Sequence, residues 1–150
     1  MAREFALQAL YAFELSNNPI DQVLNDPIWD SNRDKNAMEF ANKLVRVVIE
    51  KCPECDGLVR KKVANWDFKR IAVMDRLILC MAICEFLFFD DIPPKVSIDE
   101  AIEVAKKYST ENSGRFINGI LDAVLLDLKK ANRIHKSGRG LIDKKTTGRS

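Results

Sequence analysis

Apolar residues recur at intervals of three and four along most of this 150-residue chain, which is the spacing of amphipathic helices. No segment alternates apolar and polar residues with the period of two that marks a strand. We therefore expect an all-α fold in which about seven helices surround one core. The predicted helices cover residues 2–16, 21–25, 36–51, 54–64, 68–88, 98–108 and 113–128, with a loop through 27–32.

Prolines set most of the predicted boundaries. Pro53 interrupts one helical pattern, and the consecutive Pro93 and Pro94 interrupt another. Proline removes a backbone donor and restricts the residue before it, so we expect helices to end at these points. Ser97 followed by Glu100 has the spacing of a capping box, which predicts that the next helix begins after Ser97.

Charge divides the chain more sharply than its net value of +2 indicates. From Lys129 onward there are eight lysines and arginines against one acid, whereas the preceding residues are mildly acidic. Beyond Asn132 the apolar period also stops. We therefore expect a helical domain over residues 1–132 and a flexible basic tail over 133–150, which either contacts a polyanion or is simply solvated.

The longest apolar run extends from Leu77 to Phe89 and is interrupted only by Glu85. It is shorter than the ~20 residues of a membrane span, so we interpret it as a core helix. The start of the chain does not resemble a signal peptide. These observations predict a cytoplasmic protein that does not associate with membranes.

Catalytic and metal chemistry have weak support in the sequence. The single histidine, His135, lies in the predicted tail, and neither a nucleophile with a partner base nor a glycine-rich phosphate loop is evident. Cys52-x-x-Cys55 and Cys80-x-x-x-Cys84 could in principle converge on a structural zinc ion. Free cysteine usually packs as a small hydrophobic residue, so we expect no metal, no cofactor and no enzymatic activity.

The start of the last predicted helix carries Arg115, Phe116 and Asn118. A guanidinium binds phosphate, an aromatic ring stacks on a base, and an amide reads a base edge, so the group favours RNA binding. Asn118 and Gly119 are also weak helix formers. Residues that disfavour the local helix are typical of functional sites. Alternatively, Gly119 permits close helix packing and Asn118 bonds a neighbouring backbone.

Three residues of the first predicted helix raise the same question: Arg3, Gln8 and Tyr11. Tyr11 lies off the apolar stripe and has a polar tip, which suits a contact with RNA. The alternative is a tyrosine that packs at the edge of the helix.

Several segments together resemble the NusB family of transcription antitermination factors. These segments are Arg3–Tyr11, Arg70–Ile71, Met74–Leu79, Ile92–Pro93, Lys95–Ser109 and Phe116–Asp122. The resemblance implies the NusB fold, with two packed helical subdomains. It also implies binding to the boxA RNA of ribosomal RNA leader transcripts, together with the ribosomal protein NusE. The assembly would join the elongating RNA polymerase complex and suppress termination.

The resemblance also assigns roles to particular residues. Arg3 and Tyr11 match RNA-contact positions of the family, and Asn112, Ser113 and Phe116 match its RNA-facing loop and helix start. Asp75 matches a contact position for NusE, with Met74 beside it.

Departures from the family pattern change the charge near the expected RNA. Arg3 stands alone where relatives carry several arginines, and Cys80 replaces a frequent arginine. Asn112 replaces a frequent acid, which favours RNA binding.

The alternatives to an antitermination factor are a stand-alone relative of the RNA-binding domain of ribosomal RNA cytosine methyltransferases, or a protein-interaction scaffold without RNA binding. Apolar residues at 87–89 could also support a homodimer.

Overall fold

The computed structural model describes residues 2–26, 34–63, 65–138 and 140, and within these ranges it contains seven helices and no strand. The expected loop at 27–32 and residues 141–150 of the expected tail lie outside the described residues. The helices are α1 (Ala2–Ser16), α2 (Ile20–Leu24), α3 (Lys35–Arg60), α4 (Asn65–Arg70), α5 (Val73–Phe88), α6 (Pro94–Tyr108) and α7 (Glu111–Lys130).

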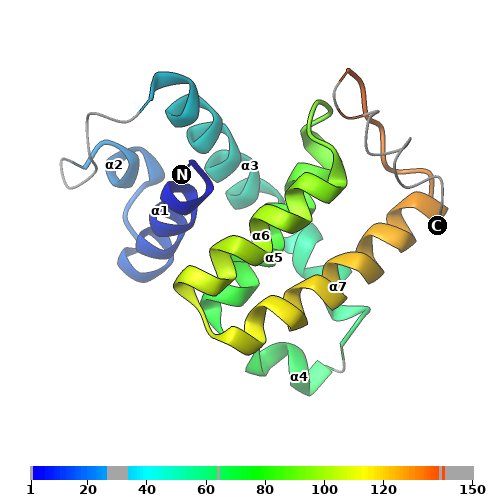
Figure 1. Ribbon diagram of the computed structural model, residues 1–150. Helices are drawn as coiled ribbons and strands as arrows, with labels where there is room; N and C mark the ends of the chain where they lie inside the picture. Colours follow the sequence, from blue (N-terminus) through cyan, green and yellow to red (C-terminus); the bar gives the residue numbers. More distant parts are fainter. Residues whose placement is uncertain (1, 27–33, 64, 139, 141–150) are drawn as a thin grey trace.

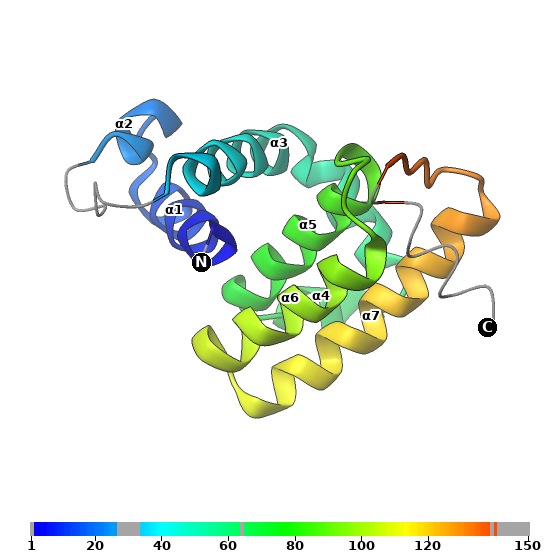
Figure 2. The same ribbon diagram turned by 45° about the horizontal axis from the view of Figure 1, so that its top comes forward.

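Helix α5 is the centre of the fold. Its residues from Leu77 to Phe86 are all buried, and it packs against α1, α3, α6 and α7. Figures 1 and 2 show α1, α2 and the first part of α3 on one side of the molecule, and α5, α6 and α7 on the other. This arrangement confirms the predicted all-α fold. None of the helices in the described ranges combines the length and apolar content that a membrane span requires.

Pro53 lies inside α3, so the prediction of two helices separated at this proline is wrong. Proline within a helix costs about 3 kcal/mol. Buried residues lie on both sides of it, with Leu44 and Val48 before and Cys55 and Val59 after, and α3 packs along α5. The burial of these side chains offsets the cost of the missing backbone hydrogen bond.

Two further boundaries differ from the predictions. The helix expected over 68–88 is divided, because Ala72 adopts an extended conformation (φ −59°, ψ 147°) between α4 and α5. Helix α6 begins at Pro94, whose fixed φ suits a first helical position. The predicted capping role of Ser97 is therefore wrong: Ser97 is buried inside α6, and its hydroxyl donates to Glu85 Oε1 at 2.7 Å.

The first part of the expected tail packs on the helical body. Ile134 is buried, and Lys136 is only 7% exposed. The Lys136 ammonium donates to the backbone oxygens of Glu85 (2.9 Å) and Phe89 (2.7 Å) at the C-terminal end of α5, where a positive charge is favourable. The expectation of a free extension is therefore wrong for residues 133–138.

Candidate nucleic-acid interface

Helix α7 begins at a network of hydroxyl groups that surrounds a buried carboxylate. The Thr110 side chain accepts from the Ser113 backbone N–H at 3.2 Å, which caps the helix two residues earlier than predicted. The Ser113 hydroxyl donates to Asp75 Oδ2 at 3.0 Å, and the Ser109 hydroxyl donates to Asp75 Oδ1 at 2.7 Å. These bonds fix the start of α7 relative to α5.

One face of α7 is open to solvent. Asn112, Arg115 and Asn118 follow one another at intervals of three, and all three are exposed. Such spacing places side chains on the same side of a helix. Phe116 is half-buried beside this face. A guanidinium, two amides and an aromatic ring thus form what we call the α7 face, which consists of Asn112, Arg115, Phe116 and Asn118. Its donors suit phosphate and base edges, and its ring suits stacking.

A groove borders the α7 face and connects it with the start of α5. Phe116 and Asp75 both line the groove, so the predicted RNA-binding and NusE-binding residues lie next to each other. The lining residues are Val63, Asp67, Arg70, Ile71, Ala72, Asp75, Ser109, Thr110, Ser113 and Phe116. Sequence reasoning missed Ser109 and Thr110, which hold the network together, and Arg70, which adds a cation.

Arg3 is turned inward and is not part of the α7 face. Its Nε donates to Glu85 Oε2 at 2.8 Å and its Nη2 donates to Glu85 Oε1 at 2.7 Å. The Arg3 side chain is 16% exposed and that of Glu85 is 1% exposed. Burial lowers the pKa of Arg3, but hydrogen bonds and charge from Glu85 outweigh burial and raise that pKa above its ordinary value. Arg3 therefore takes part in an internal ion pair. The sequence held a signal for it, because Glu85 is the only acid in the apolar run from Leu77 to Phe89 and a buried acid requires a partner.

Gln8 also bonds within the protein. Its Nε2 donates to the Tyr108 hydroxyl at 2.8 Å, and that hydroxyl donates to Glu4 Oε1 at 3.0 Å. A hydrogen bond from Lys107 is the main cause that lowers the pKa of Glu4. Tyr11 is half-buried against the hydrophobic core. Gln8 thus joins α1 to α6, and the structure does not bring Arg3, Gln8 or Tyr11 together with the α7 face into one group of contacts.

The cysteines converge between α3 and α5. Cys55, Cys80 and Cys84 are fully buried, as expected of core residues, and Cys52 is half-buried. Cys55 Sγ lies 3.5 Å from Cys84 Sγ, and all four are free thiols. Hydrogen bonding to Cys80, with burial second, raises the pKa of Cys52. The Cys52 thiol is therefore in the protonated form near neutral pH.

Comparison with known proteins places this architecture in a family. The NusB family model matches residues 1–126. The chain belongs to the NusB family. It is 44% identical over 142 residues to the transcription antitermination protein NusB of Chloroherpeton thalassium, covering 94% of this chain and 67% of that protein. It is also 44% identical over 142 residues to the NusB of Salinibacter ruber, covering 94% of this chain and 89% of that one.

Solved NusB structures share the fold. The T. maritima NusB superposes with a TM-score of 0.74 at 40% identity, covering 83% of this chain and 88% of that one. A crystal structure of NusB and NusE in complex with dsRNA superposes with a TM-score of 0.71 at 25% identity, covering 84% of this chain and 94% of that one. The resemblance recognised in the sequence is thereby confirmed at the level of family and fold.

Within this NusB fold, the residues expected at the NusE contact lie at the first turn of α5. Met74 is half-buried, while Asp75 is 9% exposed and accepts the two hydroxyl bonds described above. The apolar residues suggested for a homodimer are mostly core, because Phe89 is buried and Leu87 and Phe88 are half-buried. The homodimer stays a prediction.

Proposed function

We propose that this protein is a transcription antitermination factor that binds boxA RNA of ribosomal RNA leader transcripts jointly with NusE and has no catalytic step. Membership of the NusB family and relatives named as antitermination proteins support the proposal. A solved relative that binds both NusE and dsRNA supports the two partners. Assembly with the elongating RNA polymerase complex would then suppress termination.

The α7 face is the structural observation that most strongly supports RNA binding. Arg115 offers a charged donor fork to phosphate, and Asn112 and Asn118 offer amides to base edges. Stacking of a base on Phe116 would contribute ~1–3 kcal/mol. Ser113 acts indirectly, since its hydroxyl is engaged by Asp75 and holds the helix start in place.

The adjoining groove supports a composite surface in which NusE and RNA bind side by side. Asp75 lines the α5 side of the groove, with Met74 next to it in the sequence, and Phe116 lines the α7 side. NusE bound at the first turn of α5 would extend the surface that RNA meets at α7. The Asp75–Ser113 bond already fixes α5 and α7 relative to each other. Joint binding of NusE and RNA would therefore require no conformational change.

A titration of labelled boxA RNA tests the proposal, with and without NusE, using single-stranded and duplex forms and a scrambled sequence as control. Arg115→Gln is expected to weaken binding and to reduce the slope of log affinity against log salt by about 0.7–0.9, the value of one phosphate contact. Lys35→Gln, which removes an exposed cation at the start of α3 on the other side of the molecule, is the matched control and should change neither value. Absence of boxA binding in the presence of NusE would instead support the scaffold interpretation.

A further inference from the structure

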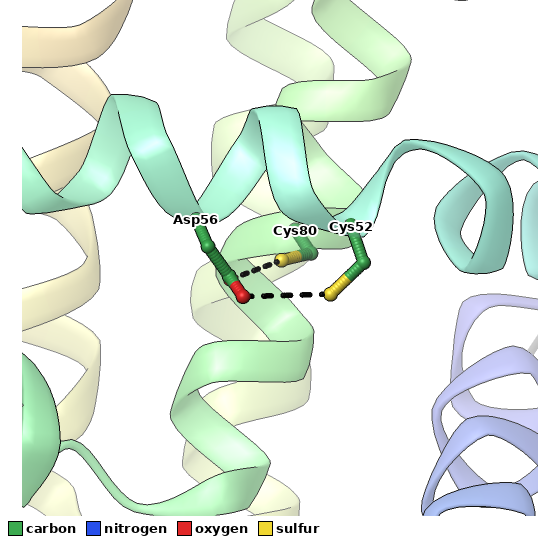
Figure 3. Close-up of side chains that lie close together, drawn as sticks. All are labelled: Cys52, Asp56 and Cys80. Atoms are coloured by element: carbon green, nitrogen blue, oxygen red, sulfur yellow. Dashed lines mark hydrogen bonds between the residues drawn. The ribbon is translucent and has the colours of Figure 1, made fainter.

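Two thiols and a carboxylate meet between α3 and α5, away from the α7 face. Cys52 and Asp56 are four residues apart on α3, a spacing that places both side chains on one side of a helix, and Cys80 comes from α5. Asp56 Oδ1 lies 3.3 Å from Cys80 Sγ, and Asp56 Oδ2 lies 3.6 Å from Cys52 Sγ. Figure 3 shows the three side chains pointing toward one another.

Each sulfur lies beside a different oxygen of Asp56, at a separation close to the sulfur–oxygen edge of a zinc coordination tetrahedron. Zinc binds thiolate sulfur at about 2.3 Å and carboxylate oxygen at about 2.0–2.2 Å, so that sulfur and oxygen ligands are about 3.5 Å apart at tetrahedral angles. The candidate ligand atoms of Cys52, Asp56 and Cys80 all lie within 4.8 Å of one another. We propose that Cys52, Asp56 and Cys80 form a Zn²⁺ site in this protein.

Burial and coordination number agree with such a site. Cys80 is fully buried and therefore held in place by packing, whereas Cys52 and Asp56 are half-buried, which leaves a path for the ion. Three protein ligands leave the fourth position of a tetrahedral zinc ion for water or an added thiol. The sequence pattern favoured core packing for Cys80 and Cys84 and placed Cys52 and Cys55 beside a helix start, and that prediction did not include the carboxylate of Asp56.

Charge balance also permits zinc binding. When Zn²⁺ binds, the Cys52 and Cys80 thiols each lose one proton and form zinc–sulfur bonds, while the Asp56 carboxylate binds as it is. Two positive charges enter and two protons leave, so the net charge of the cluster is unchanged. Arg76, whose Nη1 lies 3.7 Å from Asp56 Oδ2 and 3.9 Å from Cys52 Sγ, continues to neutralise the surrounding negative charge.

Zinc titration of the full, reduced and chelator-stripped chain, without an added histidine tag, tests the site. A chromogenic chelator in competition should report one Zn²⁺ bound per chain, and a pH indicator should report about two protons released per zinc. Cys52→Ser and Asp56→Asn should each weaken binding at least about tenfold. Bound Co²⁺ should show a thiolate-to-metal charge-transfer band that Cys52→Ser diminishes.

Two control variants separate this site from general thiol or acid effects. Cys84→Ala removes a neighbouring thiol outside the ligand set, and Glu54→Gln removes an exposed carboxylate of α3. Both should keep the affinity of the unmodified chain; if Cys84→Ala does not fold, Glu54→Gln alone is the control. The proposal is overturned if zinc does not bind at one per chain, or if Cys52→Ser and Asp56→Asn bind it as tightly as the unmodified chain.

Discussion

Replacing Arg3 with glutamine tests whether this residue acts inside the fold or on RNA. In the structure its guanidinium makes two hydrogen bonds to the Glu85 carboxylate, which also accepts a hydrogen bond from the Ser97 hydroxyl. Arg3→Gln removes the compensating charge from a side chain that is 1% exposed. Breaking a buried ion pair in this way costs about 3–5 kcal/mol. For a chain of this size that corresponds to a melting temperature about 6–20 °C lower.

The assay is thermal and urea unfolding, followed by boxA RNA binding at a temperature where the variant is folded. Arg46→Gln is the matched control, because Arg46 and Asp21 form an exposed ion pair, and it should cost no more than about 1 kcal/mol. RNA affinity of Arg3→Gln should be unchanged. An unchanged melting temperature combined with weakened RNA binding would refute the internal role and restore Arg3 to the RNA surface.

Three other predictions concern Lys136, the basic tail and Cys52. Lys136→Met removes two charged hydrogen bonds to the end of α5 and should lower the free energy of unfolding in urea by at least about 1.5–3 kcal/mol; an unmoved midpoint would contradict this. Removal of residues 141–150, which hold three basic residues and one acid, should weaken RNA binding and flatten its salt dependence, and an unchanged slope would exclude a role for these ten residues of the basic tail. Hydrogen bonding to Cys80 and burial raise the pKa of Cys52 in the folded, metal-free protein. The stability that the protonated Cys52 thiol contributes is therefore complete below the pKa of a cysteine in the unfolded chain, about 8.5, and declines at higher pH. Urea unfolding between about pH 8 and pH 10 should therefore show a smaller loss of stability in Cys52→Ser than in the unmodified chain, and equal losses would contradict the assignment.

The helices were predictable because the spacing of apolar residues records which side of each helix is buried. The boundaries were less predictable, because contacts with other helices decide them. Pro53 would end an isolated helix, yet packing against α5 carries α3 through it. Ser97 has the local spacing of a cap, yet its hydroxyl bonds Glu85, which lies 12 residues earlier on another helix.

The candidate site was predictable only where its residues are neighbours in the sequence. Arg115, Phe116 and Asn118 lie within one turn of α7, so a local pattern indicated them. Asp75 and Ser113 are 38 residues apart, and Arg3 and Glu85 are 82 apart. No periodicity connects such pairs, and for this reason the hydroxyl network and the inward position of Arg3 emerged only from the structure.

The most direct test of the account compares Phe116→Ala with the unmodified chain in an anisotropy titration of boxA RNA in the presence of NusE. Loss of ~1–3 kcal/mol of stacking predicts about 5- to 150-fold weaker binding, with a melting temperature only slightly lowered because the ring is half-exposed. Ile117→Ala, at the adjacent and fully buried position, should instead destabilise the fold strongly. Unchanged RNA affinity in Phe116→Ala, or a fall in melting temperature as large as that of Ile117→Ala, would contradict the account.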